Sequence, residues 1–364
     1  MDTDTNTADA AASGAATAEQ KQPRIVTSRG LREFLEQQRL SIAFTSYQSG
    51  QFYMLGALPN GKLSIVHRTF PRAMGMYAAS NRIFLGTHYQ IWRFENVLEA
   101  GELANKVHDR AFVPRVAFNT GDVDIHEITV ETGGRLVFVN TKYSCLATPS
   151  TSKAFTAIWK PDFISRIAPE DRCHLNGLAA RDGKVRYVTA TSRSDTISGW
   201  RNRKHEGGIL IDINDGRIIT EKLSMPHSPR YHDGKLYILN SGEGNICRVD
   251  EKSGAIEPLA FCPGFLRGMS IHKNYAVVGV SLPRDNTFSG LKLDDELKKR
   301  DSDPWCGVLV VDLAKGDIKH WLRFDDVIRE LFDVAVIPGV KCPMVVSNRS
   351  SEIDKLMTWD EKFN

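Results

Sequence analysis

Long apolar runs are absent from this 364-residue chain. It contains no stretch of 18 consecutive apolar residues, and it has no basic start followed by an apolar segment. A membrane-spanning helix needs about 20 apolar residues, and a secretory signal needs both features in that order. We therefore expect a cytoplasmic protein without a membrane partner.

Cysteine is sparse and never closely paired. The six cysteines are scattered, and none forms the C-x-x-C pair that is typical of zinc knuckles. In a chain without an export signal we expect free thiols, because disulfides persist mainly in oxidising compartments. Cys173 adjoins His174, but a buried structural cysteine is a more frequent outcome at such a position than a nucleophile.

Signature motifs of the common nucleotide and hydrolase folds are also missing. The chain has no G-x-G-x-x-G that opens a helix, no G-x-x-x-x-G-K-[ST], no H-E-x-x-H and no G-x-S-x-G. We therefore expect no nucleotide cofactor and neither zincin nor α/β-hydrolase chemistry. The net charge of +3 comes from 47 basic and 44 acidic residues that are interspersed, so no nucleic-acid partner is indicated.

What the chain does have is a long-period repeat of strands. Six short segments each begin with a polar residue of a kind found in functional sites, run into a β-rich stretch, and recur about every 40 to 66 residues. A second apolar strand follows each of them after a turn with Gly, Asp or Asn, as in residues 136–141. Third and fourth strands follow in most units. The pattern predicts an all-β protein, a β-propeller with four strands per blade.

Both ends of the chain are expected to complete one blade. Strands are predicted at residues 42–46, 51–57 and 63–69, whereas the last unit stops after its second strand, at residues 344–348. A blade completed from both termini closes the ring and leaves no open sheet edge. Six blades are favoured. A ring of seven blades is the alternative, because the N-terminal region has one strand more than the closure of a sixth blade requires.

The domain organisation follows from composition. Residues 1–22 are rich in Ala, Thr, Asp and Gln and contain no aromatic residue, so we expect a disordered tail. No Gly/Ser/Pro linker interrupts residues 40–350. Residues 23–364 are therefore expected to form a single β-propeller domain, and its oligomeric state, including a homo-oligomer, stays open.

The six polar residues that begin the repeat segments form the candidate functional site. If each segment starts the innermost strand of a blade, these residues converge on one central channel. They are Arg72, His126, His174, His227, Arg267 and Asp333. Histidines at equivalent positions of three successive blades would share one narrow space, and for this reason we favour a functional site over separate packing roles.

The first chemistry that fits the ring is a metal centre. His126, His174 and His227 would bind one divalent transition metal through neutral imidazoles and leave a coordination position open for water, oxygen or substrate. Asp333 would enter from the far side of a six-blade ring as a fourth ligand or as the partner of a ligand. A hydrolase or an oxygenase could use such a centre.

The second chemistry needs no metal. Arg72 and Arg267 flank the histidines, and a planar guanidinium suits bidentate capture of a carboxylate or phosphate. Histidines near two fixed positive charges would have lowered pKa values and act as general bases, with Asp333 in the same catalytic group. The substrate would be a small anionic molecule of the carboxylate type, in a lyase, isomerase or hydrolase reaction. Asn176 and Arg230 are further substrate-binding candidates.

Two long loops are expected to cover this mouth of the channel. Residues 192–199 and 282–290 share an order of Arg, Asp and Thr-x-Ser-Gly, and both return into a Gly-led apolar strand. Loops of this length in a compact domain are often lids or binding loops. Their arginines, Arg193 and Arg284, would add two cationic donors for an anionic substrate.

The ends of these two insertions carry apolar residues. The second insertion continues into a short amphipathic helix predicted within residues 291–303. Trp200 and Trp305 close the first and second insertions respectively. Each tryptophan could wall a pocket or could pack its insertion onto the scaffold, and the sequence leaves both alternatives open.

Several segments resemble one known family, an uncharacterised bacterial group of conserved hypothetical proteins with a domain of unknown function. The segments that carry the resemblance are residues 44–50, 70–75, 89–94, 173–177 and 225–230. The resemblance covers nearly all of residues 30–350 and implies a β-propeller, but it implies no reaction. A non-catalytic propeller that serves as a protein-interaction or ligand-binding platform is therefore the alternative function.

Overall fold

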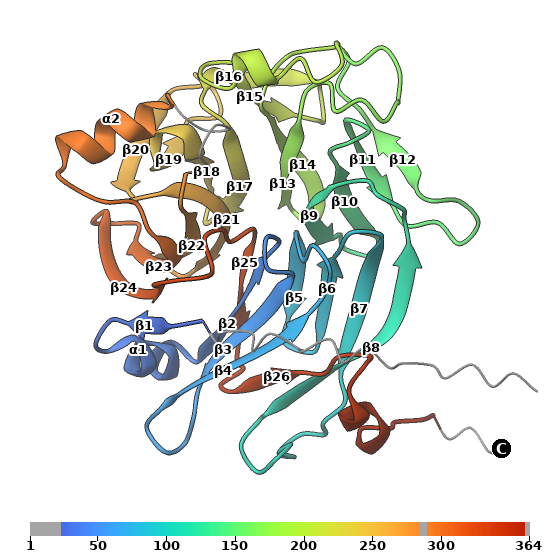
Figure 1. Cartoon of the computed structure of the whole chain (residues 1–364). Coiled ribbons are helices and arrows are strands. Elements are labelled where there is room, and N and C mark those ends of the chain that lie inside the picture. Colours follow the sequence, from blue (N-terminus) through green and yellow to red (C-terminus); the bar gives the residue numbers. More distant parts are fainter. Residues whose placement is uncertain (1–22, 284–289, 361–364) are drawn as a thin grey trace, which may run out of the picture.

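Six β-sheets surround a central axis in the computed structural model, which describes residues 23–283 and 290–360 (Figure 1). The protein is a six-bladed β-propeller, so the predicted all-β fold class is confirmed. The tail predicted for residues 1–22 lies outside the described residues. Neither α-helix of the described part, α1 (Leu31–Gln38) or α2 (Lys292–Lys299), has the length and apolarity that crossing a membrane requires.

Three blades consist of four consecutive antiparallel strands, ordered from the axis outward. One contains β9 (Ile125–Val130), β10 (Leu136–Asn140), β11 (Cys145–Thr148) and β12 (Thr156–Trp159). The next contains β13 (Leu175–Arg181), β14 (Lys184–Ala190), β15 (Gly208–Asp212) and β16 (Arg217–Leu223). The third contains β17 (Pro226–His232), β18 (Lys235–Asn240), β19 (Asn245–Val249) and β20 (Ile256–Phe261).

The blade that closes the ring combines both ends of the chain. Its inner strand is β25 (Val334–Pro338), followed outward by β2 (Leu40–Ser46), β3 (Gln51–Ala57) and β4 (Leu63–Thr69). β25 runs antiparallel to β2, with Val334 opposite Phe44. The predicted closure by strands from both termini is therefore confirmed, and β3 and β4 have the predicted bounds.

The two remaining blades each gain a fifth, outer strand. β1 (Ile25–Thr27) pairs with the outer edge of β21 (Phe265–His272), β22 (Tyr275–Ser281), β23 (Cys306–Asp312) and β24 (Asp317–Phe324). β26 (Pro343–Val345) pairs in parallel with β8 (Arg110–Asn119), outside β5 (Met76–Ala79), β6 (Arg82–Gly86) and β7 (Gln90–Asn96). The prediction that residues 344–348 form the second strand of the last blade is wrong, because β2 already occupies that position.

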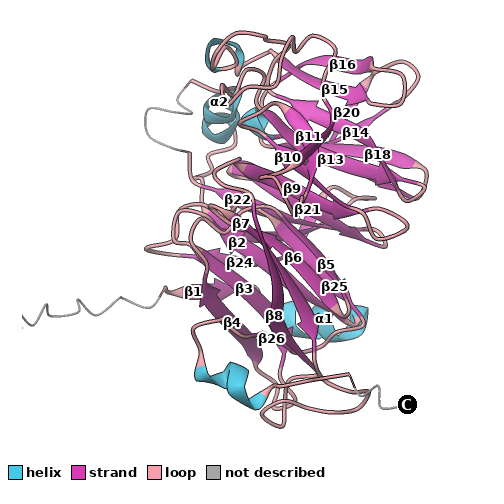
Figure 2. Cartoon of the chain, turned by 90° about the vertical axis from the view of Figure 1, so that its right-hand side faces the viewer, coloured by secondary structure: helices cyan, strands magenta, loops and turns pink. Residues whose placement is uncertain are grey.

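The helices flank the ring. Figure 2 shows α2 on one face of the propeller and α1 towards the opposite face. α1 was not predicted; it buries Leu31, Phe34 and Leu35 in the cluster between the closing blade and its neighbour. α2 is the amphipathic helix expected within residues 291–303, and it buries Leu293 and Leu297. The described part also contains three short 3-10 helices: η1 (Arg201–Arg203), η2 (Ser241–Glu243) and η3 (Ser351–Lys355).

Inner strands of neighbouring blades approach so closely that glycine is required at two positions. A Cβ atom on Gly75 would lie 2.5 Å from the carbonyl oxygen of His126. Gly268 has a φ of 72°, and a Cβ there would lie 2.5 Å from the amide nitrogen of Val334. In both cases the new Cβ would meet backbone atoms of the next blade, so no side-chain rotation could relieve the contact. The glycines therefore set how near the axis the blades can pack.

Side chains of the inner strands also hydrogen-bond backbone atoms of the following blade. The contacts are Asp333 Oδ2 with Met76 N at 2.7 Å, Glu127 Oε2 with Leu178 N at 2.8 Å, Arg230 Nε with Met269 O at 2.6 Å, and Ser270 Oγ with Val336 N at 3.1 Å. Buried polar groups are costly without such partners. Hydrogen bonds between neighbouring blades therefore surround the axis. The hydrophobic core lies between the faces of adjacent blades.

Candidate functional site

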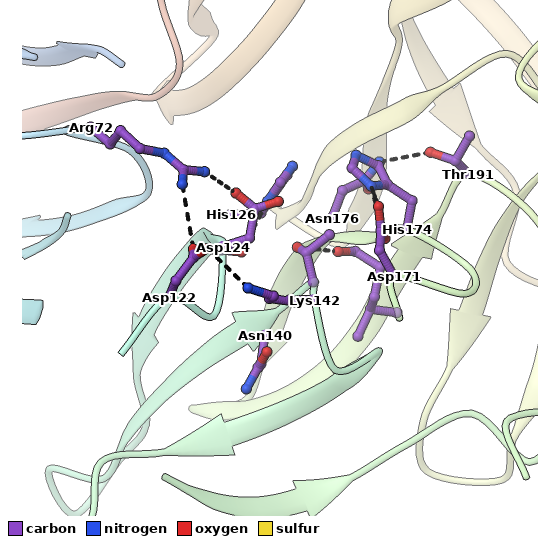
Figure 3. Close-up of polar contacts among 12 residues, drawn as sticks. Arg72, Asp122, Asp124, His126, Asn140, Lys142, Asp171, His174, Asn176 and Thr191 are labelled. Carbon is purple, nitrogen blue, oxygen red and sulfur yellow. Dashed lines mark hydrogen bonds and ion pairs between the residues drawn. The ribbon is translucent and has the colours of Figure 1, made fainter. Parts of the chain in front are cut away.

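The structure brings three histidines together at one mouth of the channel. His126 lies on β9, His227 lies on β17, and His174 immediately precedes β13. The rings of His126 and His174 meet edge to face with centroids 4.9 Å apart (Figure 3). All three side chains are buried. Residues from three successive blades therefore share one small volume.

The Nδ1 atoms of two histidines are held by backbone carbonyls. His126 Nδ1 lies 3.1 Å from the carbonyl oxygen of Asp124, and His227 Nδ1 lies 2.8 Å from that of Met225. Because a carbonyl oxygen only accepts, each Nδ1 carries the proton and each Nε2 has a lone pair. Both Nε2 atoms are buried, and neither has a hydrogen-bond partner among the described residues.

These two imidazoles are neutral near pH 7. Burial, against the opposing effect of Asp124 and with the added effect of His174 and Arg267, lowers the pKa of His126 to about 4. Burial also lowers the pKa of His227 well below its usual value, and Arg267 is the nearby charge that adds most to this shift. The site therefore presents two uncharged nitrogen acceptors.

His174 has a carboxylate as its Nδ1 partner. Its Nδ1 lies 3.0 Å from Asp171 Oδ2 (Figure 3), and its ring stacks on the indole of Trp200 with centroids 4.1 Å apart. The Nε1–H of Trp200 donates to the same carboxylate oxygen at 2.7 Å. A carboxylate in this position fixes the tautomer and stabilises the imidazolium that forms when Nε2 takes up a proton. This arrangement would allow His174 to act as a general base.

Arg267, on β21, is a buried cation. The residue is 6% exposed, and its guanidinium makes no hydrogen bond to any residue that the structure describes. Its guanidinium carbon instead lies 4.8 Å from the ring centroid of Phe332, 5.7 Å from that of Phe265 and 5.8 Å from that of Tyr47. Burial lowers the pKa of Arg267. Aromatic faces stabilise a guanidinium without using its N–H donors, which stay available for an anion.

Arg72, in contrast, is paired within the protein. Its Nη2 lies 2.8 Å from Asp124 Oδ1 and its Nη1 lies 3.4 Å from Asp122 Oδ1; Lys142 Nζ reaches Asp122 Oδ2 at 2.9 Å (Figure 3). Burial acts to raise the pKa of Asp124, but the neighbouring histidines and arginines outweigh burial and lower it. Arg72 thus neutralises carboxylates beside His126, and Arg267 is the better placed of the two arginines to bind an anion.

Backbone strain gathers at the same mouth. Arg72, Asp124 and His174 have φ angles of 50°, 56° and 51°, in the left-handed region that non-glycine residues seldom occupy. Such conformations cost about 1–3 kcal/mol each and persist where the surrounding structure imposes them. Other non-glycine residues of the described chain, such as Asp182 and Lys273, have similar φ angles in turns, so these three angles describe how the mouth is built and do not by themselves identify a site.

The two insertions pack together beside the histidines. They share one buried cluster, whose members are Trp200, Met225, Phe265, Leu291, Leu293 and Leu297. Trp200 walls the site through its contact with His174, whereas Trp305 packs on Trp321 with ring centroids 6.2 Å apart. Trp200 therefore walls the site, whereas Trp305 packs its insertion onto the scaffold.

The arginines of the insertions do not join the ring in the described structure. Arg193 is exposed and lines a surface cavity of about 120 Å³ together with Trp159 and Phe163. It therefore lies towards the outer strands, because the backbone of the loop turns its side chain away from the axis. Arg284 lies outside the described residues.

Three other predicted site residues lie in structural contacts. Asp333 and Arg230 belong to the inter-blade hydrogen bonds described above, and Arg230 also forms an ion pair with buried Glu127. Asn176 Oδ1 accepts a hydrogen bond from Thr189 Oγ1 at 2.7 Å within its own blade. Burial, followed by the charge of Glu127, raises the pKa of Asp333 to about 7. Asp333 and Arg230 therefore link neighbouring blades, and Asn176 stabilises the pairing of β13 with β14.

The geometry does not support the metal centre suggested by the sequence. Within residues 23–283 and 290–360, no three His, Cys, Asp or Glu side chains are grouped so as to hold a metal ion. His126, His174 and His227 are each oriented by a separate Nδ1 acceptor. All six cysteines are free and buried, and burial raises the pKa of the Cys173 thiol to about 12. Cys173 is therefore a packing residue rather than a nucleophile.

Sequence reasoning missed Asp124, Asp171 and Phe332. Each precedes a ring residue by one to three positions, in the loop that enters an inner strand. Asp171 could have been found by asking which carboxylate orients His174, since a catalytic imidazole is commonly held by one. Asp124 holds His126 through its backbone carbonyl, which any residue type could supply. No sequence signal distinguishes Phe332, which contacts His126 and Arg267, from an ordinary core phenylalanine.

Fold and site together define a β-propeller with a histidine- and arginine-lined channel mouth. The chain belongs to the family described as domain of unknown function DUF4915, whose model matches residues 29–346. The resemblance drawn from the sequence is thereby confirmed. No curated protein matches the chain.

Solved structures of other proteins are similar in fold. A chain of a nidogen/laminin complex has a TM-score of 0.52 and 11% identity, over 83% of this chain and 100% of that chain. A protein of unknown function from Bacteroides caccae has a TM-score of 0.49 and 10% identity, over 82% and 98%. Virginiamycin B lyase from Staphylococcus aureus has a TM-score of 0.39 and 12% identity, over 78% and 77%. At these identities the likeness concerns the fold alone.

Proposed function

We propose that this protein is an enzyme that removes a proton from a small carboxylate, with His174 as the general base. The observation that carries the proposal is the fixed arrangement of Asp171, His174 and Trp200. The carboxylate leaves Nε2 of His174 unprotonated and stabilises the cation that forms after proton uptake. The other two histidines have backbone carbonyls as their Nδ1 partners, and only His174 of the three has a carboxylate in this position.

Arg267 would hold the carboxylate of the substrate. Its guanidinium is buried, and among the described residues it has no hydrogen-bond acceptor. A desolvated cation is costly unless an anion pairs with it, and a guanidinium matches a carboxylate with two parallel hydrogen bonds. This pairing would also stabilise negative charge that develops on the carboxylate during the reaction.

The reaction class follows from these two roles. Nε2 of His174 takes a proton from the carbon next to the carboxylate, and the C–H electron pair is delocalised into the carboxylate that Arg267 holds. Departure of a leaving group from the next carbon then gives an elimination, and return of a proton to a different position gives an isomerisation. A divalent metal bound by His126, His174 and His227 is the rival mechanism; elemental analysis of the purified protein tests it.

A comparison of metabolite turnover tests the proposal. The purified protein is incubated with a bacterial metabolite extract, and small acids that disappear or appear are followed by mass spectrometry. We expect the wild type to convert at least one carboxylate and His174→Gln to convert it about 10²- to 10⁴-fold more slowly. His232→Gln is the matched control, because His232 ends β17 and bonds the backbone of Lys273.

Two outcomes would overturn the proposal. If no acid in the extract changes, or if His174→Gln converts it at the wild-type rate, His174 is not a general base. The non-catalytic platform then becomes the better description of the protein. A loss of activity in His232→Gln as large as that in His174→Gln would show that the assay reports folding rather than chemistry.

A further inference from the structure

We infer that the ligand of this site is a hydroxycarboxylate, a small acid that carries hydroxyl groups close to its carboxyl carbon. The inference rests on the proposed function for the position of the site and for the role of Arg267. It adds a requirement that the carboxylate alone does not meet, namely hydrogen-bond donors on the ligand. The observations behind it are the two nitrogen acceptors of His126 and His227.

The acceptors are fixed by the protein and cannot become donors. Backbone carbonyls of Asp124 and Met225 hold the protons of both histidines on Nδ1, so the Nε2 atoms can only accept. Burial, with Arg267 among the contributing charges, lowers the pKa of both imidazoles, so protonation does not supply a donor at pH 7. A buried acceptor without a partner is costly, and a ligand that donates to it removes this cost.

A simple carboxylate would leave these acceptors unsatisfied. Its two oxygens only accept when it is ionised, and they suit the guanidinium of Arg267. A ligand that satisfies Arg267 and the two histidines together must combine an anionic acceptor with one or more O–H or N–H donors. Hydroxyl groups near the carboxylate meet this requirement in a small molecule.

The charges around the site favour hydroxyl donors over an ammonium group. Three carboxylates near the site already have partners: Asp124 pairs with Arg72, Asp171 accepts from His174 and Trp200, and Glu330 accepts from the hydroxyl of Tyr47. An ammonium group would also lie close to buried Arg267. A hydroxyl group donates without bringing a charge, and its oxygen can still accept a hydrogen bond.

Three matched six-carbon ligands test the inference by calorimetric titration. D-Gluconate has both the carboxylate and the hydroxyl groups, hexanoate has only the carboxylate, and sorbitol has only the hydroxyl groups. D-Glycerate and propanoate form a second, shorter pair. We expect at least one hydroxycarboxylate to bind at least 10-fold more tightly than its deoxy counterpart, and sorbitol to bind more weakly than gluconate.

Substitutions assign the preference to individual residues. His126→Phe and His227→Phe should each reduce the preference for the hydroxycarboxylate over its deoxy counterpart, because they remove an acceptor and keep an aromatic ring. Arg267→Met should weaken both ligands of a pair by a similar factor, because it removes the anion partner. Circular dichroism of each variant checks that it is folded.

The inference is overturned if neither hydroxycarboxylate binds, or if hexanoate and propanoate bind as tightly as gluconate and glycerate. It is likewise overturned if both phenylalanine variants fold and keep the full preference. Titrations are made with the wild type and with His174→Gln, so binding is measured without turnover. A protein that binds hydroxycarboxylates but converts none would contradict the proposed function and leave this inference standing.

Discussion

The imidazole of His174 and the indole of Trp200 are stacked with their ring centroids 4.1 Å apart, and both rings donate a hydrogen bond to Oδ2 of Asp171. One carboxylate thus orients a ring that directly precedes β13 and a ring from the insertion between β14 and β15. The insertion that holds Trp200 also packs against the second insertion through Leu293 and Leu297. The position of the proposed base is therefore coupled to both insertions.

Replacement of Asp171 by Asn should lower kcat and leave KM nearly unchanged. The amide can donate to Nδ1 of His174 and so stabilise the wrong tautomer, which removes the lone pair from Nε2. We expect turnover of the substrate found in the metabolite assay to fall on the order of 100-fold. Trp200→Phe keeps the stacked ring and should lower turnover by less than about 10-fold. Equal activity of Asp171→Asn and the wild type would contradict the assignment.

Replacement of Arg267 by Met should weaken ligand binding without destabilising the fold. The charged hydrogen bonds to the ligand contribute about 1.5–3 kcal/mol. Thermal unfolding should stay unchanged or shift upward, because the variant removes a buried cation that has no hydrogen-bond partner among the described residues. Thermal melts with and without ligand measure both effects. If the variant unfolds while its folded fraction binds ligand normally, Arg267 is a structural inter-blade residue.

Asp333 should make the protein less stable as the pH rises from about 4 to about 7. Burial and the charge of Glu127 raise the pKa of Asp333 to about 7, against a usual value of 3.8. Within this window the unfolded chain binds fewer protons at Asp333 than the folded chain does, so this contribution to stability is complete below the window and is lost as the pH rises through 7.

The variant Asp333→Asn isolates this contribution. It has no proton to lose, so its stability relative to the wild type should increase with pH by up to about 1.4 kcal/mol per pH unit inside the window. Urea unfolding at pH 4, 5.5, 7 and 8 measures the difference. A difference that is constant across these values would mean that Asp333 is ionised in the folded protein throughout.

Replacement of Gly75 by Ala should damage both fold and site. The new Cβ would lie 2.5 Å from the carbonyl oxygen of His126 and 2.8 Å from Cα of Glu127. The backbone of β9 must move, at a cost of about 1–3 kcal/mol. Gly61→Ala is an informative comparison, because Gly61 has a φ of 85° and nothing within 4 Å of the new Cβ. It should also lose stability, by backbone strain alone, but should keep full activity.

The repeat of strands made the fold predictable. Alternating apolar strands separated by Gly, Asp and Asn turns identified the blades, and β3 and β4 have the bounds expected from the sequence. The strand with which β26 pairs could not be predicted from the repeat, because a strand of three apolar residues can pair with the free edge of any blade. Its parallel pairing with β8 depends on where the ring closes, which is a property of the whole chain.

The site was predictable only in part. Position along the repeat identified His126, His174, His227 and Arg267 as neighbours, because equivalent positions of successive blades converge on the axis. The repeat could not show that the carboxylate of Asp333 accepts a hydrogen bond from the backbone amide of Met76. Strand periodicity carries no information on how deep in the channel a side chain lies. Hydrogen-bond partners depend on the three-dimensional structure.

The closing strand has a consequence for how the protein matures. β25 pairs with β2, about 290 residues earlier in the chain, and Phe332 beside it contacts both His126 and Arg267. Ribosomes deliver the chain from its N-terminus, so all three histidines emerge before the residues that complete their surroundings. Contacts this distant in sequence form slowly. The proposed ligand site can therefore be complete only after β25 has been synthesised and paired with β2.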